Sequence, residues 1–368
     1  MQVVVVGAGY AGTIAANRLA KKVPDAHITV INPRPEFVER VRLHEELAGS
    51  GSAATPLAGM LTAGITTRIG AVEKVGEGEV LLANGDHLPY DYAYLAIGST
   101  VSPMAGTVPV GTWEGALEAG QSLAALRSGS TVTVIGGGLT GIETAAEIAA
   151  ARPELNVQLV GDNIGASLSE GARRRTGAGL EKLGVTIIEE RVNHLQTEPG
   201  TTRGTLHLSD GGTVESDLTL WAIIGTVPDL AARSGLEVDA YGRAVVDQYL
   251  RSVSNERIFV VGDCAAVPGS RAACATASPQ GAHAADTLAR IIKGRKLKPY
   301  SMGYTGQALS LGRRDGILQM SRRDDTPTRI FIAGRPAAAA KESVNRYAKY
   351  GSRTARYGWL RGPKAATR

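Results

Sequence analysis

Two segments of the chain share one order of apolar and small residues. Residues 3–12 read Val-Val-Val-Val-Gly-Ala-Gly-Tyr-Ala-Gly, and residues 132–141 read Val-Thr-Val-Ile-Gly-Gly-Gly-Leu-Thr-Gly. A run of β-branched residues is typical of a buried strand, and the alanine-rich patterns that follow are typical of helices. We expect the helices over residues 13–22 and 142–151, each ending near a proline, and further apolar strands over 28–31 and 157–160. The repeated order predicts two βαβ units of the dinucleotide-binding kind.

Each turn has the pattern G-x-G-x-x-G, whose three glycines have separate tasks. The first permits the tight turn, the second lets the backbone approach a pyrophosphate, and the third lets the helix pack against the strand. The phosphate would lie at a helix N-terminus, where free N–H groups favour an anion. The predicted binding residues are Gly7, Gly9 and Gly12 in the first unit, and Gly136, Gly138 and Gly141 in the second. A second unit that binds nothing remains the alternative.

The residue after the second strand of such a unit is commonly an acid that binds a ribose hydroxyl. The first unit has Asn32 there, which can still hydrogen-bond a ribose. The second has Gly161, followed by Asp162, with three arginines downstream at 173–175. Asn32 and Asp162 are therefore candidate ribose contacts, and both NADH and NADPH remain open.

Composition and charge point to a globular protein. The chain has 368 residues, with 46 Gly, 16 Pro and two Cys, so it is neither a disulfide scaffold nor a disordered chain. Its net charge of +5 arises at one end: residues 341–368 hold eight Lys or Arg and one acid. The remainder carries slightly more acids than bases, so nucleic acid is not expected as a partner. We find no signal-peptide pattern and no apolar run of about 18 residues, and expect a cytoplasmic protein.

The basic tail, residues 341–368, has a helical spacing of charges. Arg346, Lys349, Arg353 and Arg356 recur at three- and four-residue steps and share one predicted helix face. The other face would carry Val344, Tyr347, Ala348, Gly351 and Ala355, with Tyr357, Trp359 and Leu360 beyond it. This arrangement is typical of a helix that lies at a membrane surface, which would make the protein peripheral at the cytoplasmic face. A solvated or disordered end remains the alternative.

Three further segments extend the pattern. Residues 90–98 read Tyr-Asp-Tyr-Ala-Tyr-Leu-Ala-Ile-Gly, residues 217–228 read Asp-Leu-Thr-Leu-Trp-Ala-Ile-Ile-Gly-Thr-Val-Pro, and residues 257–264 read Arg-Ile-Phe-Val-Val-Gly-Asp-Cys. With the two glycine turns they resemble the two-dinucleotide-binding-domain flavoproteins of the pyridine nucleotide-disulfide oxidoreductase superfamily, over nearly the whole chain.

The resemblance implies an α/β fold with two Rossmann-like domains, in which an FAD domain is interrupted by an NAD(P)H domain. A small C-terminal domain with the basic tail would follow. The implied boundaries are 1–106 and 240–300 for the FAD domain, 107–239 for the NAD(P)H domain, and 301–368 for the C-terminal domain. A homodimer is an open expectation.

The same resemblance implies roles for individual residues. Asp263 would bond the ribityl chain of FAD, although a strand-end turn is its other interpretation. Val72, on a strand expected around residues 68–75, would contact adenine through its backbone, unless it is simply a core residue. Arg42 would contact a phosphate or the flavin. Further cofactor contacts are implied at Gly98, Gly262 and Ala275.

Cysteines exclude one branch of this superfamily. Disulfide reductases need two thiols near the flavin. The predicted helix over residues 38–47 has none, residues 107–239 have none, and Cys264 and Cys274 fit neither pattern. We interpret both as buried small residues.

Other segments of the sequence bear on which molecule accepts the electrons from the flavin. Arg42-Leu43-His44, residues 274–286 and residues 310–316 resemble type II NADH dehydrogenases and apoptosis-inducing-factor-like oxidoreductases. In the quinone-reducing members, the segment matching 275–280 lines the quinone pocket. This chain keeps only Gln280 of the two usual glutamines, which leaves the acceptor open between a quinone and another small molecule.

Three residues are candidates for handling protons. Glu143 matches a glutamate that faces the meeting point of nicotinamide and flavin, and a helix N-terminal acid is its other interpretation. His44 and His283 are candidate proton relays. We find no metal-ligand cluster or hydrolytic triad. The sequence thus predicts an FAD-dependent NAD(P)H:acceptor oxidoreductase. The alternatives are an oxidase or dehydrogenase acting on a secondary metabolite, and a redox-sensing flavoprotein.

Overall fold

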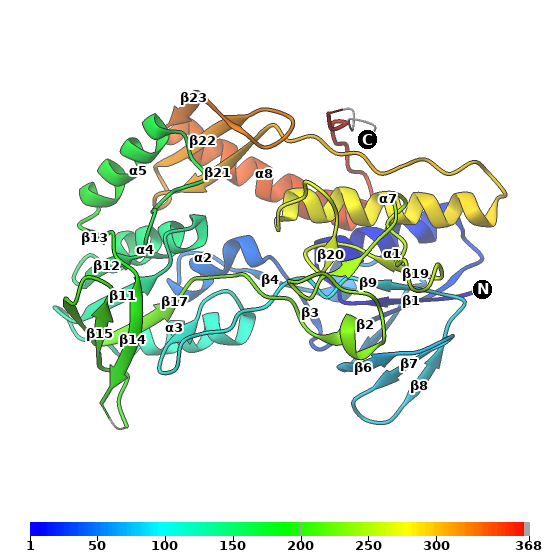
Figure 1. The fold of residues 1–368 in the computed structure, drawn as a ribbon, viewed down its shortest axis with the longest axis horizontal. Coiled ribbons are helices and arrows are strands. Elements are labelled where there is room, and N and C mark those ends of the chain that lie inside the picture. Colours follow the sequence, from blue (N-terminus) through cyan, green and yellow to red (C-terminus); the bar gives the residue numbers. More distant parts are fainter. Residues whose placement is uncertain (199, 364–368) are drawn as a thin grey trace.

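The computed structural model describes residues 1–198 and 200–363. Two parallel sheets of five strands each organise it (Figure 1). The first sheet has the order β19 (Ile258–Val260), β9 (Tyr92–Leu95), β1 (Gln2–Val6), β2 (His27–Asn32) and β5 (Thr66–Ile69). The second has the order β10 (Val108–Pro109), β17 (Leu218–Trp221), β11 (Thr131–Ile135), β12 (Asn156–Val160) and β13 (Thr186–Ile188). The α/β fold with two Rossmann-like sheets is confirmed.

The two βαβ units repeat each other in detail. Gln2 pairs with His27 and Thr131 with Asn156, which is the same separation along the chain. The helices are α1 (Tyr10–Lys22) and α4 (Leu139–Ala151). Both begin three residues earlier than the pattern predicted, because the middle glycine of each turn already caps the helix.

Three antiparallel sheets flank the parallel ones. They are β6 (Val72–Val75), β7 (Glu79–Leu82) and β8 (His87–Pro89); β14 (Val192–Thr197), β15 (Gly204–Leu208) and β16 (Thr213–Ser216); and β21 (Gly306–Ser310), β22 (Gly316–Ser321) and β23 (Pro327–Ala333). Two-stranded pairs join β3 (Glu36–Val38) to β4 (Ala54–Pro56) and β18 (Ala244–Val245) to β20 (Ala265–Ala266). The expected strand over 68–75 is therefore wrong, since it splits at Gly70 between two sheets.

The other helices cover these sheets. They are α2 (Leu43–Leu47), α3 (Trp113–Ala125), α5 (Glu170–Lys182), α6 (Leu230–Arg233), α7 (Cys274–Ile292) and α8 (Arg335–Thr354), with 3₁₀ turns at Arg40–Arg42 and Leu57–Gly59. Helix α7 crosses α1 closely, because a Cβ at Gly281 would lie 2.2 Å from the carbonyl oxygen of Ala11. The predicted continuous helix over residues 38–47 is wrong. Val38 ends β3, Arg40–Arg42 form a 3₁₀ turn, and only Leu43–Leu47 form the α-helix α2.

The tail helix packs against the first βαβ unit. Asn17 on α1 donates to the carbonyl of Ser352 at 2.8 Å, and Lys349 pairs with buried Glu39 at 2.8 Å. The helix ends at Thr354, where Ala355 takes φ +57°, so Arg356 does not extend the basic face. The prediction that Arg346, Lys349, Arg353 and Arg356 share one helix face is therefore wrong for Arg356, and Lys349 is paired with Glu39. Residues 364–368 of the predicted tail lie outside the described residues.

Candidate active site

One large cavity lies between the two glycine turns and the C-terminal part of the chain. Its volume is about 1330 Å³, more than a single small ligand occupies. Gly9 contributes to its wall from the first turn and Gly138 from the second, while Lys341 on α8 closes a third side. The fold thus brings segments more than 300 residues apart in sequence to one space.

The glycines show what this space can hold. A Cβ at Gly12 or Gly141 would lie 1.9 Å from the first glycine's carbonyl oxygen, so both must be glycine for the helix to pack. A Cβ at Gly9 or Gly138 would meet nothing within 4 Å. The second glycine of each turn therefore exposes backbone to open space at a helix N-terminus. That is the form of a pyrophosphate site, and the residues present fit two dinucleotides.

The predicted ribose contacts have different surroundings. The side-chain oxygen of Asn32 accepts from the Ala8 N–H at 3.0 Å, and its amide donates to the Arg34 carbonyl at 2.7 Å. Asn32 therefore shapes the glycine turn, and it does not line the cavity. Gly161 leaves no room for an acid, since its Cβ would lie 2.6 Å from the backbone nitrogen of Gly137. Asp162 does line the cavity.

The arginines at 173–175 do not reach the cavity. Each is ion-paired elsewhere: Arg173 with Glu189, Arg174 with Glu170 and Arg175 with Asp315. The arginine that lines the cavity on this side is Arg191. It follows β13 rather than β12, so the spacing in the sequence did not indicate it.

Arg40, and not the predicted Arg42, reaches the first nucleotide region. The guanidinium of Arg42 lies 2.9 Å from Glu45 and 2.9 Å from Glu342, and it does not line the cavity. Arg40 lines it and donates to the carbonyls of Ser99 at 2.9 Å and Gly111 at 2.8 Å. Residues two positions apart in a helical turn point to different sides, and the fold decides which of the two sides faces the cavity.

Other predicted flavin contacts gather beside Arg40. Gly98 and Gly262 take φ +67° and +84°, and Asp263 accepts from the Ser99 hydroxyl at 2.7 Å. All three line the cavity, and so does Ala275 at the start of α7. Val72 lies on the β6–β8 sheet and is not among the lining residues.

Two side chains of α7, Gln280 and His283, contact other protein groups and not the large cavity. Gln280 accepts from the Gly262 N–H at 2.7 Å and does not line the large cavity, so it holds the turn before Asp263. His283 packs against the ring of Tyr300, with centroids 5.3 Å apart, also away from the cavity. Burial lowers the pKa of His283. The structure thus does not bring the predicted relay residue His283 to the site.

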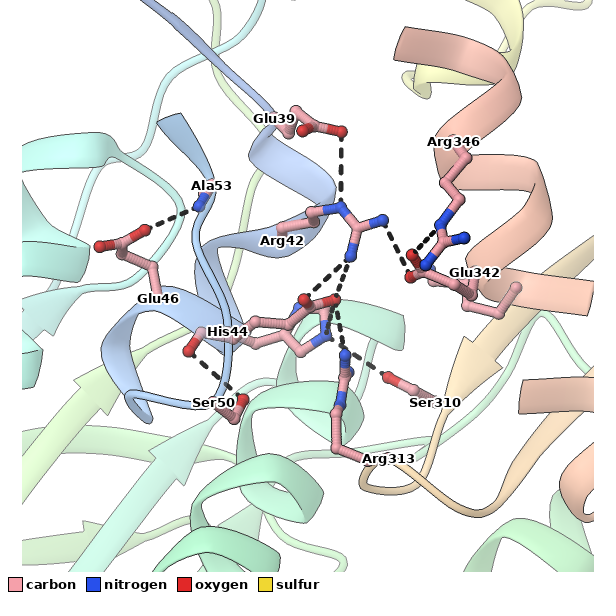
Figure 2. A network of polar contacts seen from close by, with 12 residues as sticks. Glu39, Arg42, His44, Glu46, Ser50, Ala53, Ser310, Arg313, Glu342 and Arg346 are labelled. Carbon is pink, nitrogen blue, oxygen red and sulfur yellow. Dashed lines mark hydrogen bonds and ion pairs between the residues drawn. The ribbon is translucent and has the colours of Figure 1, made fainter. Parts of the chain in front are cut away.

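Glu143 and His44 meet at the cavity wall. Glu143 accepts from the Ser310 N–H at 2.9 Å and pairs with Lys341 at 2.8 Å, and His44 Nε2 lies 3.4 Å from the Ser310 hydroxyl (Figure 2 shows the His44–Ser310 contact). Although burial opposes ionisation, Lys341, His44 and the bond from Ser310 hold the pKa of Glu143 below its usual range. Burial lowers the pKa of His44, although Glu143 opposes this. Lys341 and Ser310 were not predicted, because only the tertiary structure brings them to Glu143.

The cavity wall between α8 and the C-terminal segment is apolar. It is lined by Met302, Val344, Tyr347, Tyr357, Trp359 and Leu360. The rings of Tyr347 and Tyr357 lie 5.0 Å apart, while Val344 and Leu360 are each 46% exposed. The site therefore joins a polar interior to an apolar mouth at the surface.

The two cysteines are free and have different surroundings. Burial raises the pKa of Cys264 to about 12, which suits a core residue. Cys274 is only partly buried and lines the cavity at the start of α7, so its interpretation as a buried residue is wrong. In the described part of the chain, no three His, Cys, Asp or Glu side chains gather as a metal site would require. Within residues 1–198 and 200–363, no helix is both long and apolar enough to cross a membrane.

Comparisons with known proteins agree with this geometry. The family described as pyridine nucleotide-disulphide oxidoreductase matches residues 1–286. Human ferroptosis suppressor protein 1 is 29% identical over 339 residues, covering 87% of this chain and 89% of that protein. An NADH dehydrogenase-like protein of Mycobacterium tuberculosis is 26% identical over 390 residues, covering 94% and 93%. The sulfide:quinone oxidoreductase of Aquifex aeolicus has the same fold, with a TM-score of 0.79 at 20% identity, covering 96% of this chain and 92% of that one.

Proposed function

The chain belongs to the pyridine nucleotide-disulphide oxidoreductase family, and from that premise we propose that it transfers electrons from NAD(P)H to a quinone. It is a flavin-dependent oxidoreductase that uses FAD and NAD(P)H. Disulfide reduction is not proposed, because Cys274 at the cavity wall has no second thiol beside it there, and Cys264 is buried away from the cavity.

The continuity of the cavity carries this proposal. One space connects both glycine turns with the apolar mouth beside Tyr347 and Leu360. A quinone has an apolar body and two carbonyl oxygens, so it needs an apolar channel that ends at a hydrogen-bond donor. Lys341 provides that donor, since it lines the cavity and is held by Glu143 at 2.8 Å.

Different residues would bind the two dinucleotides and position them. When bound, FAD supplies the two-electron chemistry between nicotinamide and acceptor. Gly9 and Gly138 would admit the two pyrophosphates, and Asp263 would bond the ribityl chain beside Arg40. Asp162 would hold the nicotinamide dinucleotide by a ribose.

The charge pair at the far wall would act on the acceptor. Lys341 would donate a hydrogen bond to a quinone oxygen, where negative charge develops during reduction. The Glu143 carboxylate fixes the direction of the Lys341 ammonium. The Ser310 hydroxyl connects the His44 ring to this charge pair.

Attachment of the mouth to a membrane surface is part of the same proposal. Tyr350 and Leu360 are 52% and 46% exposed near the mouth, and Arg353 adds positive charge on the same helix. Exposed aromatic and basic residues together favour an anionic lipid surface, from which an apolar quinone can enter. We expect Tyr350→Ser with Leu360→Ser to reduce co-sedimentation with anionic vesicles, whereas Ile330→Ser, at a still more exposed position on β23, should not.

An anaerobic pair of half-reactions tests the function. NADH or NADPH should bleach the visible flavin band, and menadione should restore it. Lys341→Met should slow the second step and leave the first unchanged, while Lys349→Met on the same helix should affect neither. Reoxidation by oxygen with peroxide formation, and none by menadione, would contradict quinone as the acceptor.

A further inference from the structure

A column of buried polar side chains runs from the cavity to another part of the surface. Glu143 and Glu147 lie one turn apart on α4, and their side chains are 8% and 1% exposed. Residues at this spacing share one helix face, about 6 Å apart along the axis. That face packs against α2 and β21.

The inner half of the column consists of close contacts. The Ser310 hydroxyl lies 3.3 Å from Glu143 Oε1 and 3.4 Å from His44 Nε2. His44 Nε2 in turn lies 3.9 Å from Glu45 Oε1, on the next residue of α2. The charged groups that face the His44 ring are Glu143, Lys341, Glu147 and Glu45.

The outer half reaches solvent. Arg313 Nη1 lies 3.0 Å from Glu45 and its Nε lies 2.9 Å from Glu147, while its side chain is 39% exposed. The hydroxyl of exposed Ser50 donates to Glu147. Glu45 also pairs with Arg42 at 2.9 Å, so each buried carboxylate of this half has a cation beside it.

Packing alone does not account for such a column. Burying several carboxylates costs free energy, and apolar residues of the same volume often stabilise a core at least as well. Carboxylates, an imidazole and a hydroxyl in this order are instead suited to passing protons, with water bridging the 3.9 Å step from Glu45 to His44 and the step from Glu147 to Glu45 beside Arg313. The proposed reaction requires one, because NAD(P)H + H⁺ + quinone gives NAD(P)⁺ + quinol.

We propose that Glu147, Glu45, His44 and Ser310 carry this proton from solvent at Ser50 and Arg313 to the Glu143–Lys341 pair. The proposal rests on the proposed function and adds to it the source of the proton. The acceptor then enters through the apolar mouth and the proton arrives by a separate polar route. No member of the outer half lines the cavity, so these are positioning and relay residues.

The variant Glu147→Gln tests this in the complete holoenzyme. It keeps the shape and hydrogen bonds of the side chain and removes its ability to hold a proton. Hydride transfer from NADH takes no proton from solvent, so the bleaching rate should stay unchanged. Reoxidation by menadione should slow at least about tenfold, with a larger solvent isotope effect. Asp286→Asn changes a partly buried carboxylate on α7 that is paired with Arg18 and Lys22, and it should leave both steps unchanged.

Two further measurements separate a relay from a structural role. Small acids such as imidazole or formate should restore menadione reduction in Glu147→Gln. Histidine ¹⁵N spectra should show a lower pKa for His44 in this variant, because a nearby negative charge is lost. Equal slowing of both half-reactions without rescue, unchanged rates, or an unchanged His44 titration would each overturn the proposal.

Failure of the relay proposal and failure of the proposed function give different results. If wild-type protein does not reduce menadione, the quinone proposal fails. The relay is then measured with dichlorophenolindophenol, a soluble dye that also takes up two electrons with protons. Slowing of that step alone in Glu147→Gln would still support the relay, and equal rates in variant and wild type would refute it.

Discussion

Replacing Gly138 by alanine should weaken dinucleotide binding and leave the stability of the fold nearly unchanged. The substitution adds one methyl group at the N-cap of α4, where the backbone has φ −74° and ψ 175°, a conformation that alanine adopts without strain. Its Cβ would meet nothing within 4 Å in the protein. The methyl therefore projects into the space that we assign to the pyrophosphate of NAD(P)H.

The added methyl group should change the stability of the fold little and NADH binding more strongly. For folding, the reduced entropy of the unfolded chain stabilises by about 0.4–1 kcal/mol. This roughly offsets the loss of a glycine N-cap, about 1 kcal/mol. For binding, a methyl forced into a filled site costs about 1–3 kcal/mol. Since each 1.4 kcal/mol is tenfold, the Kd for NADH should rise about 5- to 140-fold.

Calorimetric titration of NADH, thermal melting and flavin content give the three readouts. Gly138→Ala should weaken NADH binding while its melting temperature and flavin content stay unchanged. Gly9→Ala should instead lower flavin retention. Gly141→Ala should destabilise the fold itself, because its Cβ would lie 1.9 Å from the Gly136 oxygen. Unchanged NADH affinity in folded Gly138→Ala would refute the assignment of this turn to the dinucleotide.

Other substitutions test the surroundings of the site. Arg42→Leu removes one of the two cations beside each of the buried carboxylates Glu39 and Glu45. Lys349 and Arg313 remain, so the free energy of unfolding in urea should fall by about 1.5–3 kcal/mol; a fall under 1 kcal/mol would contradict that role. Burial lowers the pKa of His44 in the folded protein below the value of about 6.5 expected for the unfolded chain. The fold therefore favours the neutral ring, and this contribution to stability is present above about pH 6.5 and is lost as the pH falls. His44→Gln should therefore flatten stability against pH below about 6.5, and an unchanged slope would argue against it. Gly161→Asp should weaken NADH binding instead of improving it, since its Cβ would lie 2.6 Å from the Gly137 nitrogen; tighter binding would show that the turn adjusts.

Local features of the fold could be predicted from the sequence. The β-branched runs before Gly7 and Gly136 form β1 and β11, and the glycine patterns end in α1 and α4. These elements depend on interactions within about 30 residues, namely strand burial, turn geometry and helix capping. For the same reason Gly98 and Asp263, which follow predicted strands, lie at the cavity.

The identity of the side chains that reach the site depended on the tertiary structure. Arg40 and Arg42 lie in one 3₁₀ turn and point to different sides of it, and the packing of that turn places Arg40 at the cavity and Arg42 beside Glu45. His283 was predicted from its type alone, and its helix presents it to Tyr300.

What the sequence alone determined is the pair of βαβ units and their glycine turns, because those rest on neighbouring residues. What only the tertiary structure decided is the chemistry at the far wall. Lys341 meets Glu143 at 2.8 Å because α8 packs back across α1, and Glu147 becomes part of a buried column because α2 and β21 close over α4. Such contacts join residues far apart in the chain, so no local pattern of apolar and polar positions records them.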